Sequence, residues 1–287
     1  MMRSRPTPHT HNHREQSVRN SRNPVLALIT AASIGPMAHA QSAPEANTDP
    51  ALVADAWHIT FTTYLWVPAM DGTLTARGRE ADVDVSVGDS FENLVDNFKF
   101  ALTGHIEARK DRFSIFGDIM YLATEDDVDR PIIGDGDIDL SQGFFEAGVA
   151  YAIVDKPVND NAARRFRVEP LAGLRLYYLD MEVNFDALSR SPGRDEMWVD
   201  GFVGARTSVD LAERLTAFAR FDIGAGGSDL AWNVILGLDA HLGKHKRLSL
   251  VGGYRWFDVD YDDGSGSDKF EFDVLMHGPF LGLGFTF

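Results

Sequence analysis

Leu281-Gly-Leu-Gly-Phe-Thr-Phe287, the last seven residues of the chain, alternate large apolar side chains with small or polar ones. Successive side chains of a strand point to opposite faces, so the leucines and phenylalanines share one face and Gly282, Gly284 and Thr286 share the other. One bulky apolar face and one small or polar face suit a wall that separates lipid from a lumen. This ending therefore predicts the terminal strand of a membrane-spanning β-barrel.

The same period of two recurs upstream. Trp57 to Val67 and Asn97 to Lys110 alternate most clearly, and the polar face of the second stretch includes His105, Glu107 and Arg109. Further alternating stretches occupy residues 113–121, 145–153, 166–178, 199–209, 215–223, 230–242 and 248–256. No stretch predicts a long helix. The predicted fold class is all-β, a transmembrane antiparallel up-and-down β-barrel of about ten strands.

The lengths of the connections orient this barrel. Tight or short connections at 110–112, 155–164, 210–214 and 243–246 alternate with acidic, glycine-rich ones at 125–137, 183–196, 226–229 and 260–268. Bacterial barrels keep their short turns and both chain ends on the periplasmic side, and their long loops outside. We therefore expect both termini in the periplasm and an even number of strands.

By the same parity, residues 68–96 form one extracellular excursion. The dipeptide Asp71-Gly72 predicts a turn, Ala81 to Val87 a short alternating strand, and Asp89 to Asp96 one or two helical turns capped by Asp89 or Ser90. If 73–76 and 82–87 entered the wall, the barrel would have about twelve strands, but a tilted spanning strand takes about 9 to 11 residues. We expect a flap, or a segment folded into the mouth of the barrel.

The N-terminal region predicts export. A basic segment precedes the apolar run Val25 to Met37, and Ala38-His39-Ala40 follows as a cleavage signature. The run is shorter than the roughly 18 apolar residues that a membrane-spanning helix needs. We expect residues 1–40 to be a signal peptide, 41–56 a short disordered periplasmic leader and 57–287 the barrel.

Charge and cysteine content exclude several classes of protein. The chain has 27 Lys and Arg against 43 Asp and Glu; without the five basic residues and one acidic residue of the first 40, 22 against 42 remain, a formal charge of −20. Nucleic acids are poor partners for such a surface, because phosphate recognition needs net positive charge. The absence of cysteine excludes disulfides, thiolate metal sites and an N-terminal lipid anchor on cysteine. No motif predicts a cofactor.

Charges of both signs recur on the polar faces of neighbouring strands. Inside a narrow barrel such charges must pair, because the desolvation of one isolated buried ion costs on the order of several kcal/mol. We therefore predict a ladder of ion pairs in the lumen. Its members are Glu107, Arg109, Asp118, Glu146, Arg167, Arg175, Asp200, Arg206, Arg220, Asp222, Asp239 and Arg255.

Two acidic segments are weak candidates for binding calcium, which prefers oxygen ligands. They supply Asp135, Asp137 and Asp139 in one segment and Asp258, Asp260 and Asp262 in the other. The second departs from an EF-hand loop, since Asp263 stands at the glycine position and Lys269 at that of the bidentate acid. A solvated acidic loop is the favoured interpretation, and divalent ions bridging to lipopolysaccharide phosphates are the alternative.

Aromatic residues fall into two girdles, as interfacial anchoring requires. Strict alternation also turns His277 outward, where a polar ring is unfavourable, so we expect a bulge at Gly278-Pro279. The girdle residues are Tyr121, Tyr178, Trp232, Tyr254 and Trp256 at the outer rim, and Trp57, Phe113, Tyr151, Phe285 and Phe287 at the inner rim.

Several short motifs carry a family resemblance. Tyr64-Leu-Trp-Val-Pro68 with Asp71-Gly72, the run Asp82 to Ser86 and the run Asp118 to Leu122 resemble a recurrent group of uncharacterised, porin-like outer-membrane proteins of Gram-negative bacteria. The resemblance implies export and a barrel in the outer membrane, and brings no catalytic or binding residues with it. The terminal aromatic also resembles that of outer-membrane barrels, which implies that Phe285 and Phe287 form the signal for the barrel assembly machinery.

Three functions remain open at this point. A structural or surface barrel in contact with membrane lipid and lipopolysaccharide is favoured, because barrels of about eight strands are filled by side chains. Its lumen would be filled by the ion pairs and by the inward phenylalanines Phe116, Phe144, Phe202 and Phe218. A narrow porin-like pore for small solutes is the first alternative. A lipid- or peptide-modifying hydrolase is the second, and it is not expected: His277 has no serine at a recognisable spacing, and the outer rim offers acids but no histidine.

Overall fold

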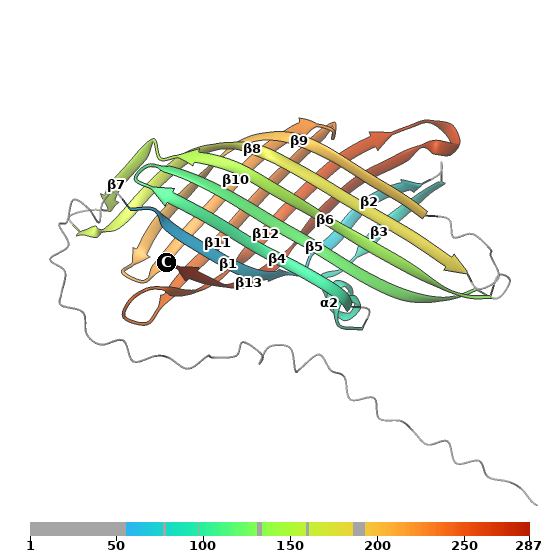
Figure 1. The fold of residues 1–287 in the computed structure, drawn as a ribbon, viewed down its shortest axis with the longest axis horizontal. Helices are drawn as coiled ribbons and strands as arrows, with labels where there is room; N and C mark the ends of the chain where they lie inside the picture. Colours follow the sequence, from blue (N-terminus) through green and yellow to red (C-terminus); the bar gives the residue numbers. More distant parts are fainter. Residues whose placement is uncertain (1–55, 77–78, 97, 131–133, 159–160, 186–192) are drawn as a thin grey trace, which may run out of the picture. The chain divides into compact units, whose positions relative to one another are not determined.

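The computed structural model describes residues 56–76, 79–96, 98–130, 134–158, 161–185 and 193–287. Ten strands form a closed antiparallel barrel, shown in Figure 1. The barrel closes between the first and last strands, where Phe61 lies opposite Phe285 and Trp66 opposite Phe280. The predicted fold class is confirmed, with ten strands in the closed wall. Around the barrel these are β1 (His58–Trp66), β4 (Phe98–Lys110), β5 (Phe113–Arg130), β6 (Gly134–Tyr151), β8 (Asn161–Phe185), β9 (Gly193–Ala212), β10 (Leu215–Gly226), β11 (Leu230–Leu242), β12 (Leu248–Asp263) and β13 (Phe270–Thr286).

One end of the barrel, the turn end, carries the tight connections and the C-terminus (Figure 1). Asp111 and Lys246 adopt positive φ angles of 52° and 54° in two of these turns. The stretch 155–164, expected as a turn, instead lies mostly in a hairpin, because the short strand β7 (Val154–Val158) pairs with the start of β8. The predicted signal peptide and residues 41–55 of the predicted leader lie outside the described residues.

At the opposite end, the loop end, the strands continue far beyond what a bilayer needs. β8 has 25 residues and β9 has 20, whereas a spanning strand takes about 9 to 11. The expected long connections at 125–137 and 183–196 were therefore too long at both ends, and the one at 260–268 was too long at its first end, where β12 continues to Asp263. Acidic residues that we took for loop signals sit in strands there, because a ladder projecting into water tolerates charge on both faces.

Residues 69–85 extend the wall instead of folding into the mouth. β2 (Ala69–Ala76) continues the line of β1 along β13, and β3 (Arg79–Val85) pairs with the other edge of β2. The prediction of a turn at Asp71-Gly72 was wrong, since both residues lie inside β2. Gly72 is needed for another reason: at φ 153° its backbone passes so close to Asp273 that an added Cβ would overlap the carbonyl oxygen of that residue.

The helix α2 (Val87–Asp96) leads from β3 to β4. Its cap is Ser86, whose Oγ lies 3.2 Å from the Asp89 backbone N–H, while the Asp89 carboxylate accepts from the Ser86 N–H and Oγ at 3.2 and 2.7 Å. This reciprocal arrangement is a capping box, so the prediction that Asp89 or Ser90 caps the helix was wrong. Within the described ranges, no helix combines the length and apolar character needed to cross a membrane.

The two faces of the wall differ sharply in chemistry. Lumen-facing positions hold the buried polar and aromatic residues, while the outward positions of the turn-end half carry exposed apolar side chains. In water such a surface would be unfavourable, whereas in lipid it is not. The exposed set includes Ile59, Phe61, Leu65, Leu102, Ile106, Ile115, Phe145, Val149, Leu174, Val199, Val203, Phe221, Ile223, Leu236, Leu238, Leu250, Leu281 and Leu283.

The register of β12 with β13 is uninterrupted from Asp263–Phe270 to Leu248–Phe285, so the bulge expected at Gly278-Pro279 is absent from this pair. The break in pairing lies on the other side of β13, between the end of β1 and the start of β2, where β13 changes its pairing partner. His277 points outward as expected. Its ring nitrogens lie 2.7 Å from the Tyr254 hydroxyl and 3.1 Å from an Asp71 carboxylate oxygen, so the polar ring is satisfied without a distortion.

Candidate functional site

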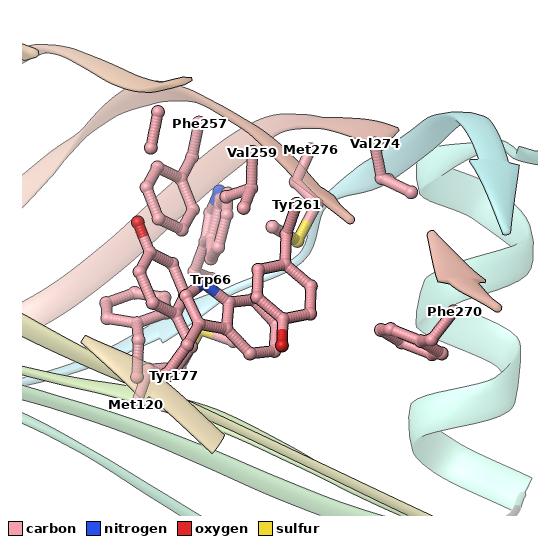
Figure 2. Close-up of a cluster of buried hydrophobic side chains, with 12 residues drawn as sticks. Trp66, Met120, Tyr177, Phe257, Val259, Tyr261, Phe270, Val274 and Met276 are labelled. Atoms are coloured by element: carbon pink, nitrogen blue, oxygen red, sulfur yellow. The ribbon is translucent and has the colours of Figure 1, made fainter. Parts of the chain in front are cut away.

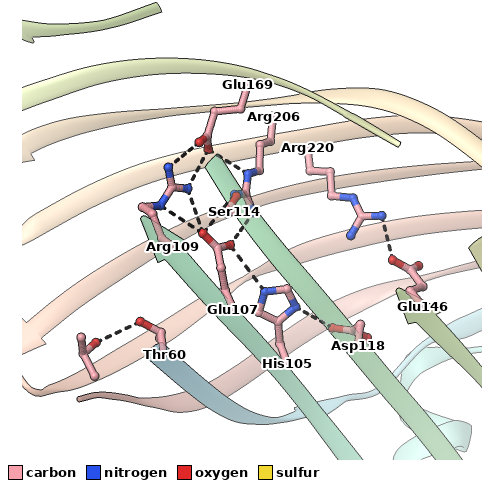
Figure 3. A network of polar contacts seen from close by, with 11 residues as sticks. Thr60, His105, Glu107, Arg109, Ser114, Asp118, Glu146, Glu169, Arg206 and Arg220 are labelled. Atoms are coloured by element: carbon pink, nitrogen blue, oxygen red, sulfur yellow. Dashed lines mark hydrogen bonds and ion pairs between the residues drawn. The ribbon is translucent and has the colours of Figure 1, made fainter. Parts of the chain in front are cut away.

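The lumen is the candidate site, and its lower tier lies toward the turn end. Arg109 and Arg206 alternate there with Glu107 and Glu169 in a ring of four side chains, and Ser114 accepts from Arg206 at 2.8 Å (Figure 3). Arg109 binds Glu169 at 2.5 Å and Glu107 at 2.8 Å, and Arg206 binds the same two carboxylates at 2.8 and 2.5 Å. Two guanidinium groups facing two carboxylates leave this tier neutral.

The upper tier lies one layer closer to the loop end and is more deeply buried. The Arg175 side chain is 0% exposed and donates to Glu146 at 2.8 Å and to Asp222 at 2.6 Å. Arg220 bridges the same two carboxylates, at 2.7 Å each. Every carboxylate oxygen of Glu146 and Asp222 thus faces a guanidinium group, which is the condition under which buried charges are tolerated.

Arg255 completes this tier from β12. Its Nε donates to the Asn233 Oδ1 at 2.9 Å, and its Nη2 lies 3.5 Å from Glu146. Asn233 in turn donates to Asp222 at 2.9 Å. Asn233 on β11 was missed because the predicted ladder was built from charged residues alone, whereas strand alternation turns this neutral side chain to the same inner face.

A third polar group adjoins the lower tier on the β1 side of the lumen. Asp118 accepts from the Tyr64 hydroxyl at 2.7 Å and lies 3.2 Å from the His105 Nδ1. The other ring nitrogen of His105 is 3.9 Å from Glu107, in the lower tier. A histidine held between two carboxylates can carry a proton, but in the described part of the chain no serine or threonine hydroxyl contacts His105 or Asp118.

All twelve residues of the predicted ladder lie on the lumen side, but they do not form one ladder. Arg167 pairs near the turn end with Asp155 of β7, at 3.3 Å. Asp200 is 0% exposed and accepts from the backbone N–H groups of Gly227 and Ser228, so it fixes the β10–β11 turn. Asp239 forms no ion pair with the residues that the structure describes, and Glu169, which was not among the twelve, closes the lower tier.

Above the upper tier a layer of rings crosses the lumen (Figure 2). Tyr177 stacks on Trp198 with centroids 4.9 Å apart, and Phe144 packs against Phe257 at 5.1 Å. The layer also rests on the charges below, since the Arg175 and Arg255 guanidinium groups lie 4.8 and 4.9 Å from the Phe257 ring. Its members are Trp66, Met120, Phe144, Tyr177, Trp198, Ala231, Phe257, Val259, Tyr261, Phe270, Val274 and Met276, which we call the aromatic plug.

Of the phenylalanines expected to fill the lumen, Phe144 belongs to the aromatic plug. Phe116 and Phe202 are 3% and 2% exposed and lie under the guanidinium groups of the tiers. Phe218 lines a cavity of about 330 Å³ beside β1. A second cavity of about 430 Å³ adjoins the first toward the turn end. The lumen is therefore packed in its loop-end half and hollow in its turn-end half.

The outer wall holds one polar group that bears on enzymatic activity. His277, with Tyr254 and Asp71, faces outward near the loop end, so the expectation of a rim without histidine was wrong. Its partners are a hydroxyl and a carboxylate on neighbouring strands. Among the described residues, no serine contacts His277.

The candidate calcium residues lie in strands. Asp258, Asp260 and Asp262 alternate along β12, with Asp260 opposite Asp273 of β13. The pKa of Asp260 is raised by partial burial of its carboxyl group and by repulsion from Asp273. Asp135, Asp137 and Asp139 lie in β6, and the structure describes only their backbone. Among the side chains that are described, no three acids or histidines are grouped to hold a metal ion.

Comparisons with known proteins bear on the fold. No protein-family model matches the chain, and no curated protein matches it. The outer-membrane protease OmpT of Escherichia coli aligns over 81% of this chain and 97% of its own, with 10% identity and a TM-score of 0.52. The chain has the fold of an outer-membrane β-barrel. At this identity the likeness to OmpT extends to the fold alone.

Two further structures align over similar lengths with lower scores. Ail, the attachment invasion locus protein of Yersinia pestis, covers 80% of this chain and 98% of its own, with 10% identity and a TM-score of 0.35. Neisserial surface protein A covers 80% and 97%, with 14% identity and a TM-score of 0.29.

Proposed function

We propose that the chain is an integral outer-membrane protein with a structural or surface role, whose lumen is closed by its own side chains. The observation that carries the proposal is the aromatic plug resting on the upper tier. Trp198 and Tyr177 are 7% and 5% exposed, and Arg175 beneath them is fully buried. A ten-stranded barrel lies near the size at which side chains fill the interior, well below the 16 or more strands that leave a channel.

The membrane location is supported by the exposed apolar belt. Leu174, Val203 and Leu281 are 60%, 60% and 61% exposed on the outward face, and surface of this kind is stable against lipid tails. We place the turn end and both chain termini in the periplasm, because bacterial barrels keep their short turns there. The projecting loop-end strands then face outward, above the lipopolysaccharide.

Assembly would begin from the last strand. Phe287 is 79% exposed, yet its backbone is anchored, with its N–H donating to the Ile59 carbonyl at 2.9 Å. The ring is thus presented at the turn end by an ordered strand. We assign Phe285 and Phe287 as the signal that the barrel assembly machinery recognises.

Conductance tests the closed lumen. The purified chain, reconstituted in planar bilayers, is expected to give no reproducible single-channel openings, while its heat-sensitive migration on gels shows that the barrel is folded. A conducting outer-membrane barrel reconstituted in parallel controls for insertion. Stable, reproducible openings of the folded chain would refute the closed lumen and support the narrow pore, to which the two turn-end cavities lend some support.

A further inference from the structure

The turn-end half of the lumen contains two cavities that share four lining residues. Their volumes are about 330 and 430 Å³, and the larger one reaches the strand ends at Asp210, Thr216 and His241. Glu107, Arg206, Phe218 and Asp239 line both cavities, so these four residues mark the passage from one to the other. A small molecule that enters from the turn end would meet this passage before the aromatic plug stops it.

The guanidinium groups that line the cavities already have acceptors, including Arg167, which shares Asp155 with Arg165. Arg206 binds Glu107 and Glu169, Arg220 binds Glu146 and Asp222, and Arg255 binds Asn233 and approaches Glu146. An anionic ligand would have to replace these carboxylates, whose geometry is already bidentate or bridging. The tiers therefore give little affinity for an anion.

Asp239 stands apart from this pairing. Its Oδ1 is sealed from solvent and accepts no hydrogen bond, and the carboxylate has no ion-pair partner among the described residues. Its cross-strand neighbours on β10 and β12 are Thr216 and Val251, neither of which carries a charge. By contrast, Asp210 in the same cavity accepts from the Thr216 hydroxyl at 2.7 Å and from the Arg165 backbone N–H at 2.8 Å. A carboxylate left unpaired in a confined lumen favours a cation beside it.

The wall around Asp239 is apolar on one side. Phe218, Ile235, Val251 and Phe280 line the smaller cavity opposite the polar side chains of β1, β4 and β5. Phe218 borders both cavities beside Asp239, and an aromatic face attracts a cation within about 6 Å of its centroid. The smaller cavity falls within the range of roughly 300 to 1,000 Å³ typical of small-molecule sites.

We propose that the turn-end half of the lumen binds a small organic cation, an ammonium group on an apolar body. Asp239 is the counter-ion, Phe218 lies against the ammonium group, and Ile235, Val251 and Phe280 receive the apolar body. This site does not depend on the closed lumen of the proposed function, since a ligand held below the aromatic plug needs no passage through it.

Three probes of similar size separate charge from apolar contact: 2-phenylethylammonium, 2-phenylethanol and 3-phenylpropanoate. Binding to the full barrel in detergent micelles is measured by titration calorimetry. We expect the ammonium probe to bind at least about tenfold more tightly than the alcohol, a difference typical of one charge-assisted contact, and the carboxylate to bind weakest. Equal binding of ammonium and alcohol, or tighter binding of the carboxylate, would overturn the proposal.

Variants test the residue assignment. Asp239→Asn is expected to abolish the preference for the ammonium probe, whereas Asp210→Asn, whose carboxylate already has partners, is expected to keep it. Val251→Trp fills the apolar side and is expected to lower binding of ammonium and alcohol alike. If Asp239→Asn keeps the preference, Asp239 is not the counter-ion. The three-probe comparison on the unaltered chain decides the ligand class even if a variant fails to fold.

Discussion

The indole ring of Trp198 stacks on the phenol ring of Tyr261 with centroids 4.0 Å apart and planes inclined by 10°. The two residues come from β9 and β12, which are not neighbours in the barrel wall. The stack therefore crosses part of the lumen, beside the contacts of Phe257 on β12 with Phe144 on β6 and Tyr177 on β8.

Replacing both rings is expected to open a path. The Trp198→Ala/Tyr261→Ala double variant should show single-channel openings in planar bilayers, because no other stacked pair reaches across between β9 and β12 within the described residues. Each large-to-small change also costs stability, about 3 to 5 kcal/mol for a buried tryptophan. Trp232→Ala, at the outer rim, is the matched control and should stay silent. A silent double variant that still folds would show that the Trp198–Tyr261 stack is not needed for closure, and that the tiers and the remaining rings of the aromatic plug suffice.

Removing a buried guanidinium is expected to destabilise the barrel strongly. Arg175→Met removes one of the guanidinium groups that pair with the buried carboxylates of Glu146 and Asp222. Breaking a buried ion pair in this way lowers the free energy of unfolding by about 3 to 5 kcal/mol.

Arg165→Met is the matched control for Arg175→Met. Arg165 is 38% exposed and pairs with Asp155 at the turn end, where an exposed pair contributes about 0 to 1 kcal/mol. Urea unfolding in lipid vesicles, followed by tryptophan fluorescence, measures both variants. Equal losses would contradict the role assigned to the upper tier.

Gly72→Ala is expected to detach β2 from β13. The added Cβ would overlap the Asp273 carbonyl oxygen, and the φ of 153° is strained for any residue with a side chain, so the loss should exceed about 1 kcal/mol. Hydrogen exchange of β2 should rise while that of β9 stays unchanged. Gly201→Ala is the control, because its Cβ would meet nothing within 4 Å. Unchanged protection of β2 would show that the backbone can move apart at no cost.

The loop-end extension is expected to become less stable as pH rises. The pKa of Asp260 is raised, first by partial burial and then by Asp273 directly opposite. The folded extension then holds its proton more tightly than the unfolded one, so its free energy of unfolding falls as pH increases above the ordinary aspartate pKa of about 3.9. The destabilisation is complete above the raised pKa and absent below the ordinary one.

Hydrogen exchange of residues 258–263 and 270–275, corrected for the intrinsic rate at each pH, measures this effect. Asp273→Asn should weaken the pH dependence, and Asp155→Asn, at the turn end, should leave it unchanged. Protection that increases with pH would contradict the repulsion between these carboxylates.

Phe287→Ala is expected to impair assembly in cells without impairing the folded barrel. The side chain is 79% exposed and the backbone bonds of this residue do not depend on it. In vitro refolding should therefore match that of the unaltered chain, while the amount of protein in the outer-membrane fraction should fall several-fold. Leu230→Ala, an exposed apolar residue of β11, is the control. Normal assembly of Phe287→Ala would rule out the terminal ring as the signal.

Period-two alternation predicted the all-β class and the ten-strand count, because it depends only on the geometry of an extended backbone. Strand ends were predicted poorly at the loop end. There Asp-rich and Gly-rich segments continue as strands, and Asp71-Gly72, a good turn dipeptide in isolation, lies inside β2 because pairing along β13 outweighs its local preference. The local sequence was enough to predict a helix near residue 89. Where the helix begins, however, depends on the capping box between Ser86 and Asp89.

Which charges pair is a different matter. The sequence by itself determined that residues such as Glu107 and Arg206 share the inner face, because side-chain direction follows the backbone period. Only the tertiary structure decided that these two, 99 positions apart on β4 and β9, meet at 2.5 Å, while Asp239 meets no cationic side chain in the described ranges. Contacts across a lumen depend on strand stagger and barrel closure, which no local pattern encodes.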